Sequence, residues 1–116
     1  MHENDIARQI VDSAYKIHVR LGPGLLESVY ATVLAYELEK RGLVVARQQP
    51  LPVVYEDVTL EMGFRVDLLV ADKVTVELKS VEQMLPLHQK QLLTYLRLAD
   101  KRLGLLINLG STHQRR

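Results

Sequence analysis

The chain has 116 residues, of which 47% are hydrophobic and 25% are charged. This length suits one domain with its own core, and the composition is that of an ordinary globular protein. The absence of cysteine excludes disulfides, thiolate metal sites and a cysteine nucleophile, and it is consistent with the cytoplasm. No apolar run approaches the roughly 20 residues needed to cross a bilayer. We therefore expect one domain over residues 1–116, with loose tails at 1–5 and 110–116.

The charge is nearly balanced, because 15 Lys and Arg residues face 14 Asp and Glu residues and leave a net charge of +1. Proteins that grip a nucleic-acid backbone by charge carry a clearly basic face. Composition alone therefore argues mildly against a tight nucleic-acid binder, unless the basic residues are segregated on one side or a partner contributes to binding.

The N-terminal part of the chain has the spacing of two helices. Asp5 is expected to cap the first helix, which ends at the breaker Gly22-Pro23-Gly24. A second helix is expected from about Leu25 to Arg41, with Gly42 as its C-terminal cap. The inward residues expected for the first helix are Ile6, Ile10, Ala14, Ile17 and Leu21, and those for the second are Val29, Val33, Leu34 and Leu38.

The middle of the chain is rich in Val and Leu, as strands are. Residues Leu43 to Tyr55 are broken by Pro50 and Pro52, which predicts an edge strand with a bend. Three further strands are expected, and they cover Val58–Met62, Phe64–Val70 and Val74–Val81.

A third helix and a last strand complete the pattern. Pro86 opens the helix, which runs to about Ala99 and should turn Leu92, Leu93, Leu96 and Ala99 inward. The run Leu103 to Leu109 is nearly all apolar and predicts a buried strand. The resulting order of helices and strands is α-α-β-β-β-β-α-β, which indicates an α/β fold with a mixed sheet flanked by helices.

Asp67 and Glu77 are candidates for a shared site, and strand parity decides whether they meet. If Ala71-Asp72-Lys73 is a three-residue connection, Val70 pairs with Val74, and Asp67 lies opposite Glu77 on one face of the sheet. A two-residue turn would place the two carboxylates on opposite faces. The hypothesis of a joint site therefore requires an odd-length loop or a bulge.

Two carboxylates and Lys79 converging on one sheet face require an explanation, because like charges repel unless a cation intervenes. Mg²⁺ or Mn²⁺ held by oxygen ligands would supply that cation. The alternative is a solvated sheet face with a Glu–Lys pair, and the tripeptide alone favours it. However, Glu77 and Lys79 lie in a strand that is expected to be central and buried on its other face. Charged residues are seldom found there without a function or a partner, which favours a functional site.

Two helices carry further candidates. Glu27 lies at the start of the second helix, where an acidic residue also suits the helix dipole, and Tyr30 follows on the same face and could orient it. His88, Gln91 and Tyr95 form a polar stripe on the third helix. For His88 we favour a solvent-facing position, whereas Gln91 and Tyr95 are more suggestive of a role at a phosphate or at water.

Four motifs together resemble those of a known family. The run Gly24-Leu25-Leu26-Glu27-Ser28-Val29-Tyr30 resembles the motif of the GxxExxY proteins, which belong to the PD-(D/E)xK nuclease superfamily. Asp67 with Glu77-Leu78-Lys79 is similar to the acidic residue and the E-x-K strand of that superfamily. Gln91 to Tyr95 is similar to the QxxxY element of RecB-like exonucleases. The resemblance covers Ile6 to Asn108, although no proline precedes Asp67.

This resemblance implies a restriction-endonuclease-like αβββαβ core with an extra N-terminal helix. It also implies that Mg²⁺ or Mn²⁺ is held by Asp67, Glu77 and the backbone carbonyl of Leu78, with Glu27 as a further direct or water-mediated ligand. Lys79 would position or deprotonate the attacking water, which makes the implied catalytic set Glu27, Asp67, Glu77 and Lys79. Gln91, Tyr95 and Tyr30 would position substrate or water.

The implied function is a metal-dependent nuclease that hydrolyses phosphodiester bonds in nucleic acid, with DNA favoured over RNA. The alternative is a catalytically weak or inactive module of the same fold that binds nucleic acid or protein, and the small size and balanced charge support it. A homodimer through the apolar first helix and the proline-broken strand would enlarge any substrate groove.

Overall fold

The computed structural model describes residues 1–110, and for residues 61–64 it describes the backbone only. The helices and strands follow the order expected for the αβββαβ core with an extra N-terminal helix, and the fold prediction is confirmed. None of the helices among these residues is long and apolar enough to cross a membrane. The elements are α1 (Glu3–Leu21), α2 (Glu27–Lys40), β1 (Val45–Tyr55), β2 (Val58–Val70), β3 (Val74–Lys79), α3 (Pro86–Ala99) and β4 (Leu103–Asn108).

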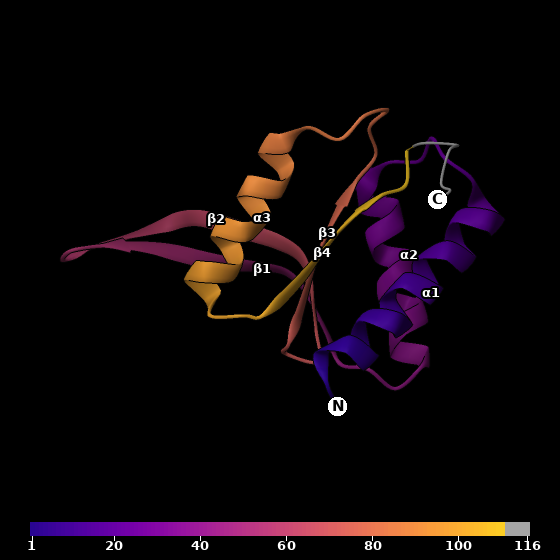
Figure 1. Ribbon diagram of the computed structural model, residues 1–116, viewed down its shortest axis with the longest axis horizontal. Coiled ribbons are helices and arrows are strands. Elements are labelled where there is room, and N and C mark those ends of the chain that lie inside the picture. Colours follow the sequence, from indigo (N-terminus) through magenta and orange to yellow (C-terminus); the bar gives the residue numbers. More distant parts are fainter. Residues whose placement is uncertain (111–116) are drawn as a thin grey trace.

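Among the described residues, the sheet has four strands in the order β1-β2-β3-β4. The first three are antiparallel neighbours, and β4 runs parallel to β3 after the crossover through α3. Figure 1 shows α1 and α2 on one side of the sheet and α3 on the other, with the β1–β2 hairpin reaching beyond the body of the protein. The site face described below is the face that α3 covers.

The hydrophobic core lies between the sheet and the α1–α2 pair. Alternation along β3 turns Val74, Val76 and Leu78 toward this core, where each is at most 1% exposed. The intervening Glu77 and Lys79 therefore face α3. The helices contribute Ile6, Ile10, Ala14, Ile17, Tyr30, Ala31, Leu34, Ala35 and Leu38 to the core.

Several boundaries differ from those expected. Residues 58–62 and 64–70 form one strand, which pairs with β1 on both sides of the glycine between them, with a register shift at that point. Helix α1 begins at Glu3, within the expected loose tail, and the cap is His2, whose Nδ1 accepts a hydrogen bond from the Asn4 N–H at 3.0 Å. Asp5 is therefore in the first turn and is not the cap. Residues 111–116 of the other expected tail lie outside the described residues.

Some residues expected to face inward do not. Leu21 is 46% exposed, Val29 is 39% exposed and Leu93 is 59% exposed. On α3 the buried position is Tyr95, so the helix is turned to bring its tyrosine, and not Leu93, against the sheet. Strand β4 is only half-buried along its length, since it lies at an edge of the sheet.

The connection between β2 and β3 is Ala71-Asp72-Lys73, and Val70 pairs with Val74. Ala71 and Asp72 both have a positive φ, of 54° and 56°, which turns the chain sharply. The odd-length loop required for a joint carboxylate site is thus present. In β1, where a bend was expected at the prolines, the pairing has a register shift between Leu51 and Val53.

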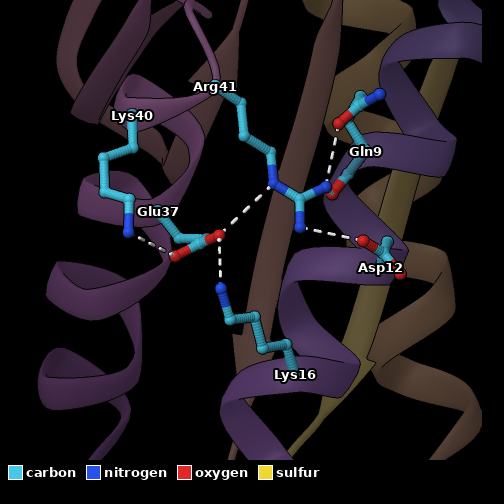
Figure 2. A network of polar contacts seen from close by, with 6 residues as sticks. All are labelled: Gln9, Asp12, Lys16, Glu37, Lys40 and Arg41. Atoms are coloured by element: carbon cyan, nitrogen blue, oxygen red, sulfur yellow. Dashed lines mark hydrogen bonds and ion pairs between the residues drawn. The ribbon is translucent and has the colours of Figure 1, made fainter.

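A polar network fixes α1 against α2 (Figure 2). Arg41 donates to Gln9 Oε1 and to Asp12 Oδ2, each at 2.8 Å, and its Nε lies 3.4 Å from Glu37 Oε2. Lys16 Nζ lies 3.3 Å from the same oxygen of Glu37. These contacts lower the pKa of Glu37, with the hydrogen bond from Lys16 as the largest cause. The network sets the position of α2, from whose first turn Glu27 projects.

Candidate metal-binding active site

The centre of the site is a pair of carboxylates at the point where the ladder between β2 and β3 ends. The last regular pair of the ladder is Leu68 with Val76, and one residue further Asp67 lies opposite Glu77. At this position, backbone N–H groups bond to carboxylate side chains of the neighbouring strand and not to its carbonyl groups. The Asp67 N–H donates to Glu77 Oε1 at 3.2 Å, and the Leu78 N–H donates to Asp67 Oδ2 at 2.7 Å. Each carboxylate is therefore held by the backbone of the opposite strand.

The backbone of β1 is irregular beside the same position. Regular pairing skips Gln48, which would lie opposite Asp67, and Gln48 has a φ of 51°. A non-glycine residue in this region is strained, and such strain often accompanies functional sites. The irregularity interrupts the β1–β2 ladder opposite Asp67, whose N–H points to the other neighbour, β3, and bonds to Glu77.

Glu77 has an unusually high proton affinity. Burial raises the pKa of Glu77, and the adjacent negative charge of Asp67 raises it further, to about 7. The positive charge of Lys79 opposes this shift. At neutral pH the Glu77 carboxyl thus holds a proton for much of the time, at a position that a bound cation could occupy instead.

The Leu78 carbonyl is oriented toward the same gap. The N–H and C=O groups of one strand residue point to the same edge of the strand, and the Leu78 N–H points to Asp67. The Leu78 carbonyl therefore faces β2 where the regular ladder has ended. The backbone ligand implied by the family resemblance is on the side of the carboxylate pair.

Lys79 lies two residues after Glu77 and on the same face of β3, and it is half-buried. Its positive charge lowers the pKa of Glu77, against the effects of burial and of Asp67. Within residues 1–110, its ammonium group has no hydrogen-bond or ion-pair partner. It is a cation available beside the carboxylate pair.

Glu27 is near the end of β3 but makes a different contact. Its Oε2 accepts a hydrogen bond from the backbone N–H of Ser80 at 3.1 Å, and Ser80 Oγ donates to the Leu25 carbonyl at 3.0 Å. These bonds join the start of α2 to the residue that follows Lys79. No three His, Asp or Glu side chains among the described residues lie close enough together to hold a metal by themselves. Glu27 is therefore placed beside the site without joining the carboxylate pair.

Tyr30 is fully buried, and its hydroxyl group serves the loop before α2. The hydroxyl donates to the Gly22 carbonyl at 2.5 Å and accepts from the Leu25 N–H at 3.2 Å. Among the described residues no hydrogen bond joins it to Glu27; the hydroxyl ties together the loop that leads into α2.

Helix α3 brings Tyr95 to the sheet face of the site. Tyr95 is 6% exposed, and its pKa is raised by burial and then by the charge of Glu77. Gln91 is exposed one turn earlier, on the same side of the helix. His88 Nδ1 accepts from the Leu85 N–H at 3.1 Å, so it caps the helix rather than simply facing solvent.

Sequence reasoning missed Asn108 at the end of β4. Its Oδ1 accepts from the Val81 N–H at 3.2 Å, and its Nδ2 donates to the Val81 carbonyl at 2.8 Å. The segment after Lys79 is thereby tied to β4, as Glu27 ties it to α2. The only available signal was that Asn108 is the single polar side chain of β4.

The comparison with protein families agrees with this geometry. The family model described as the PD-(D/E)XK nuclease superfamily matches residues 4–116, which is almost the whole chain. No curated protein and no solved structure matches the chain. With an acidic residue, an E-x-K strand and the αβββαβ core in the arrangement described above, the chain belongs to the PD-(D/E)XK nuclease superfamily.

Proposed function

We propose that the protein hydrolyses phosphodiester bonds of nucleic acid with the help of Mg²⁺ or Mn²⁺, that DNA is its favoured substrate, and that it is a member of the GxxExxY group. The observation that carries the proposal is the pair Asp67 and Glu77, which face each other in a gap of the sheet with Lys79 on the same face. Membership of the nuclease superfamily supports it.

The residues present fit a divalent cation. Asp67 and Glu77 each use one carboxylate oxygen for the backbone of the opposite strand, and each has a second oxygen. Their mutual repulsion is the kind that a hard cation relieves, and carboxylate and carbonyl oxygens are the ligands that Mg²⁺ and Mn²⁺ prefer. We assign Asp67, Glu77 and the Leu78 carbonyl as ligands. Glu27 is assigned a water-mediated contact, because its carboxylate is held at Ser80.

The other residues would bind and orient the reactants. A bound cation would supply charge neutralisation at the phosphate and a lower pKa for water. Lys79, with its free ammonium group, would hold the attacking water or a phosphate oxygen and is the candidate for moving the proton. Tyr95 would fix the orientation of Glu77, and Gln91, exposed one turn away, would contact the substrate.

The test is cleavage of single- and double-stranded DNA and RNA in Mg²⁺ or Mn²⁺ by the wild type, Lys79→Ala and Glu77→Gln. We expect both variants to lose at least about a hundredfold in rate, as expected for removal of a group that acts on the reacting atoms. Lys73→Ala is the matched control, since Lys73 lies at the turn of the same hairpin and contacts the Met1 carbonyl. Equal rates for the wild type and the two site variants would exclude this mechanism.

A second candidate is a module of the same fold that binds nucleic acid or protein without cleaving it. It is favoured by the lack of a third acidic or histidine ligand beside Asp67 and Glu77 among the described residues, and by the balanced charge. Calorimetric titration with Mn²⁺ separates the two candidates. Binding that is lost in Glu77→Gln supports the nuclease, whereas no binding at millimolar metal supports the module.

A further inference from the structure

The two edges of the sheet are built differently. At the edge formed by β1, the strand carries Pro50, Pro52, Arg47 and the irregular residue Gln48. Prolines, charges and irregularities are the devices by which proteins prevent an edge strand from pairing with another chain. The edge formed by β4 has the sequence Leu-Gly-Leu-Leu-Ile-Asn, with no charge and no proline, and its pairing with β3 is regular throughout.

The outward backbone groups of β4 can be identified from its pairing with β3. The Leu109 N–H donates to the Lys79 carbonyl at 2.8 Å, and alternation along the strand then turns the backbone groups of Gly104 and Leu106 away from β3. In the described part of the chain, nothing pairs with these outward groups of Gly104 and Leu106. They form a template for a further strand.

An apolar stripe of α1 lies beside this edge. Val11, Tyr15 and Val19 recur every fourth residue and are 53%, 65% and 63% exposed. Val11 and Tyr15 line a hollow together with Ile107 of β4 and with Leu109. The stripe and the open strand edge therefore form one continuous surface, which we call the β4–α1 face.

We propose that the β4–α1 face binds a second copy of this chain, with the two β4 strands paired antiparallel and the two α1 stripes in contact. Antiparallel pairing of identical strands is self-complementary about a two-fold axis, so one surface serves both copies and the assembly closes as a dimer. Strand β1, the other element expected at an interface, lies at the opposite edge of the sheet and takes no part.

The size of the face sets the strength of the dimer. Six residues of β4 extend about 20 Å, and a strand edge with a helix packed beside it is about 20 Å across. Each copy then buries roughly 400–600 Å², which is at the low end of specific interfaces. The main-chain bonds and the three exposed apolar side chains add specificity, and a dissociation constant in the micromolar range is expected.

Sedimentation velocity over a range of protein concentrations tests the proposal. The wild type should change from monomer to dimer, and Val11→Lys should weaken the association at least about tenfold, since it buries a charge at the interface. The control is Val54→Lys, because Val54 is similarly exposed, at 66%, but lies on the distant β1–β2 hairpin. A wild type that stays monomeric at about 100 µM, or equal weakening by the two substitutions, would overturn the proposal.

Two further measurements test the strand pairing itself. Leu106→Pro removes an outward N–H without removing a bond to β3, so a variant that remains folded should not dimerise. The Leu106 amide of the wild type should exchange with solvent more slowly as protein concentration rises. A folded Leu106→Pro that still dimerises overturns the proposal, and so does slow exchange in the monomer, which would mean that another part of the chain covers the edge.

Discussion

Replacing Glu77 by glutamine should make the metal-free protein more stable at alkaline pH. Burial and the charge of Asp67 raise the pKa of Glu77 from 4.5 to about 7. The unfolded chain releases this proton near pH 4.5 and the folded protein releases it near pH 7. The folded state is therefore progressively disfavoured between these pH values, and the loss of stability is complete above pH 7.

The magnitude follows from the two pKa values. A rise from 4.5 to about 7 corresponds to about 3.4 kcal/mol for an unscreened group. Because Glu77 is partly open to solvent, we expect roughly 1–2 kcal/mol. Glutamine keeps an oxygen that can accept from the Asp67 N–H and carries no charge, so the variant should lack the decline.

The assay is urea denaturation of the wild type and Glu77→Gln in EDTA at pH 5 and pH 8, with the exposed Glu39→Gln as a control. Stability of the wild type relative to Glu77→Gln should fall by about 1–2 kcal/mol between the two pH values. Added Mg²⁺ should restore the wild type at pH 8 and leave the variant unchanged. A wild-type-to-variant difference that is the same at both pH values in EDTA would refute the reasoning.

Three other substitutions test separate parts of the structure by urea denaturation. Tyr30→Phe removes a buried hydroxyl that bonds to the loop at 22–25, and it should cost about 1–3 kcal/mol. Gly104→Ala would place a Cβ 2.7 Å from Thr75 Oγ1, so a loss of about 1–3 kcal/mol is expected. Lys16 and its neighbours lower the pKa of Glu37, so Glu37 contributes stability above pH 4.5 that is lost as the pH falls. Glu37→Gln should therefore be less stable than the wild type at pH 7. The difference in unfolding free energy between the two proteins should disappear in acid.

The carboxylate pair could be predicted because it depends on local rules. Strand alternation and the length of the connection at 71–73 determine that Asp67 lies opposite Glu77, and the structure has this register. Neither rule predicts where the regular hydrogen bonding between β2 and β3 ends. That the side chains of Asp67 and Glu77 replace backbone pairing became visible only in three dimensions, as did the irregular φ of Gln48 beside them.

The contacts between distant segments could not be read from the sequence. Glu27 and Ser80 are separated by 53 positions, and no periodicity links them. Helix α3 shows the same limit, because its leucines cover more than one face of the helix. Packing against the sheet determines which face of α3 is buried. Tyr95 lies on the buried face, and Leu93 is exposed. Local spacing predicted that α3 exists and where it begins and ends, but not its rotation.

The hydrogen bonds of Asp67 and Glu77 have a consequence for how such a site can change in evolution. Both side chains complete the bonding of two strands where the regular ladder has stopped. A lineage that no longer cleaved nucleic acid would still need an oxygen acceptor for the Leu78 N–H and another for the Asp67 N–H. Asparagine and glutamine would meet that need and alanine would not. Descendants without activity should therefore preserve amides at these two positions, as a trace of the site in chains that have lost its chemistry.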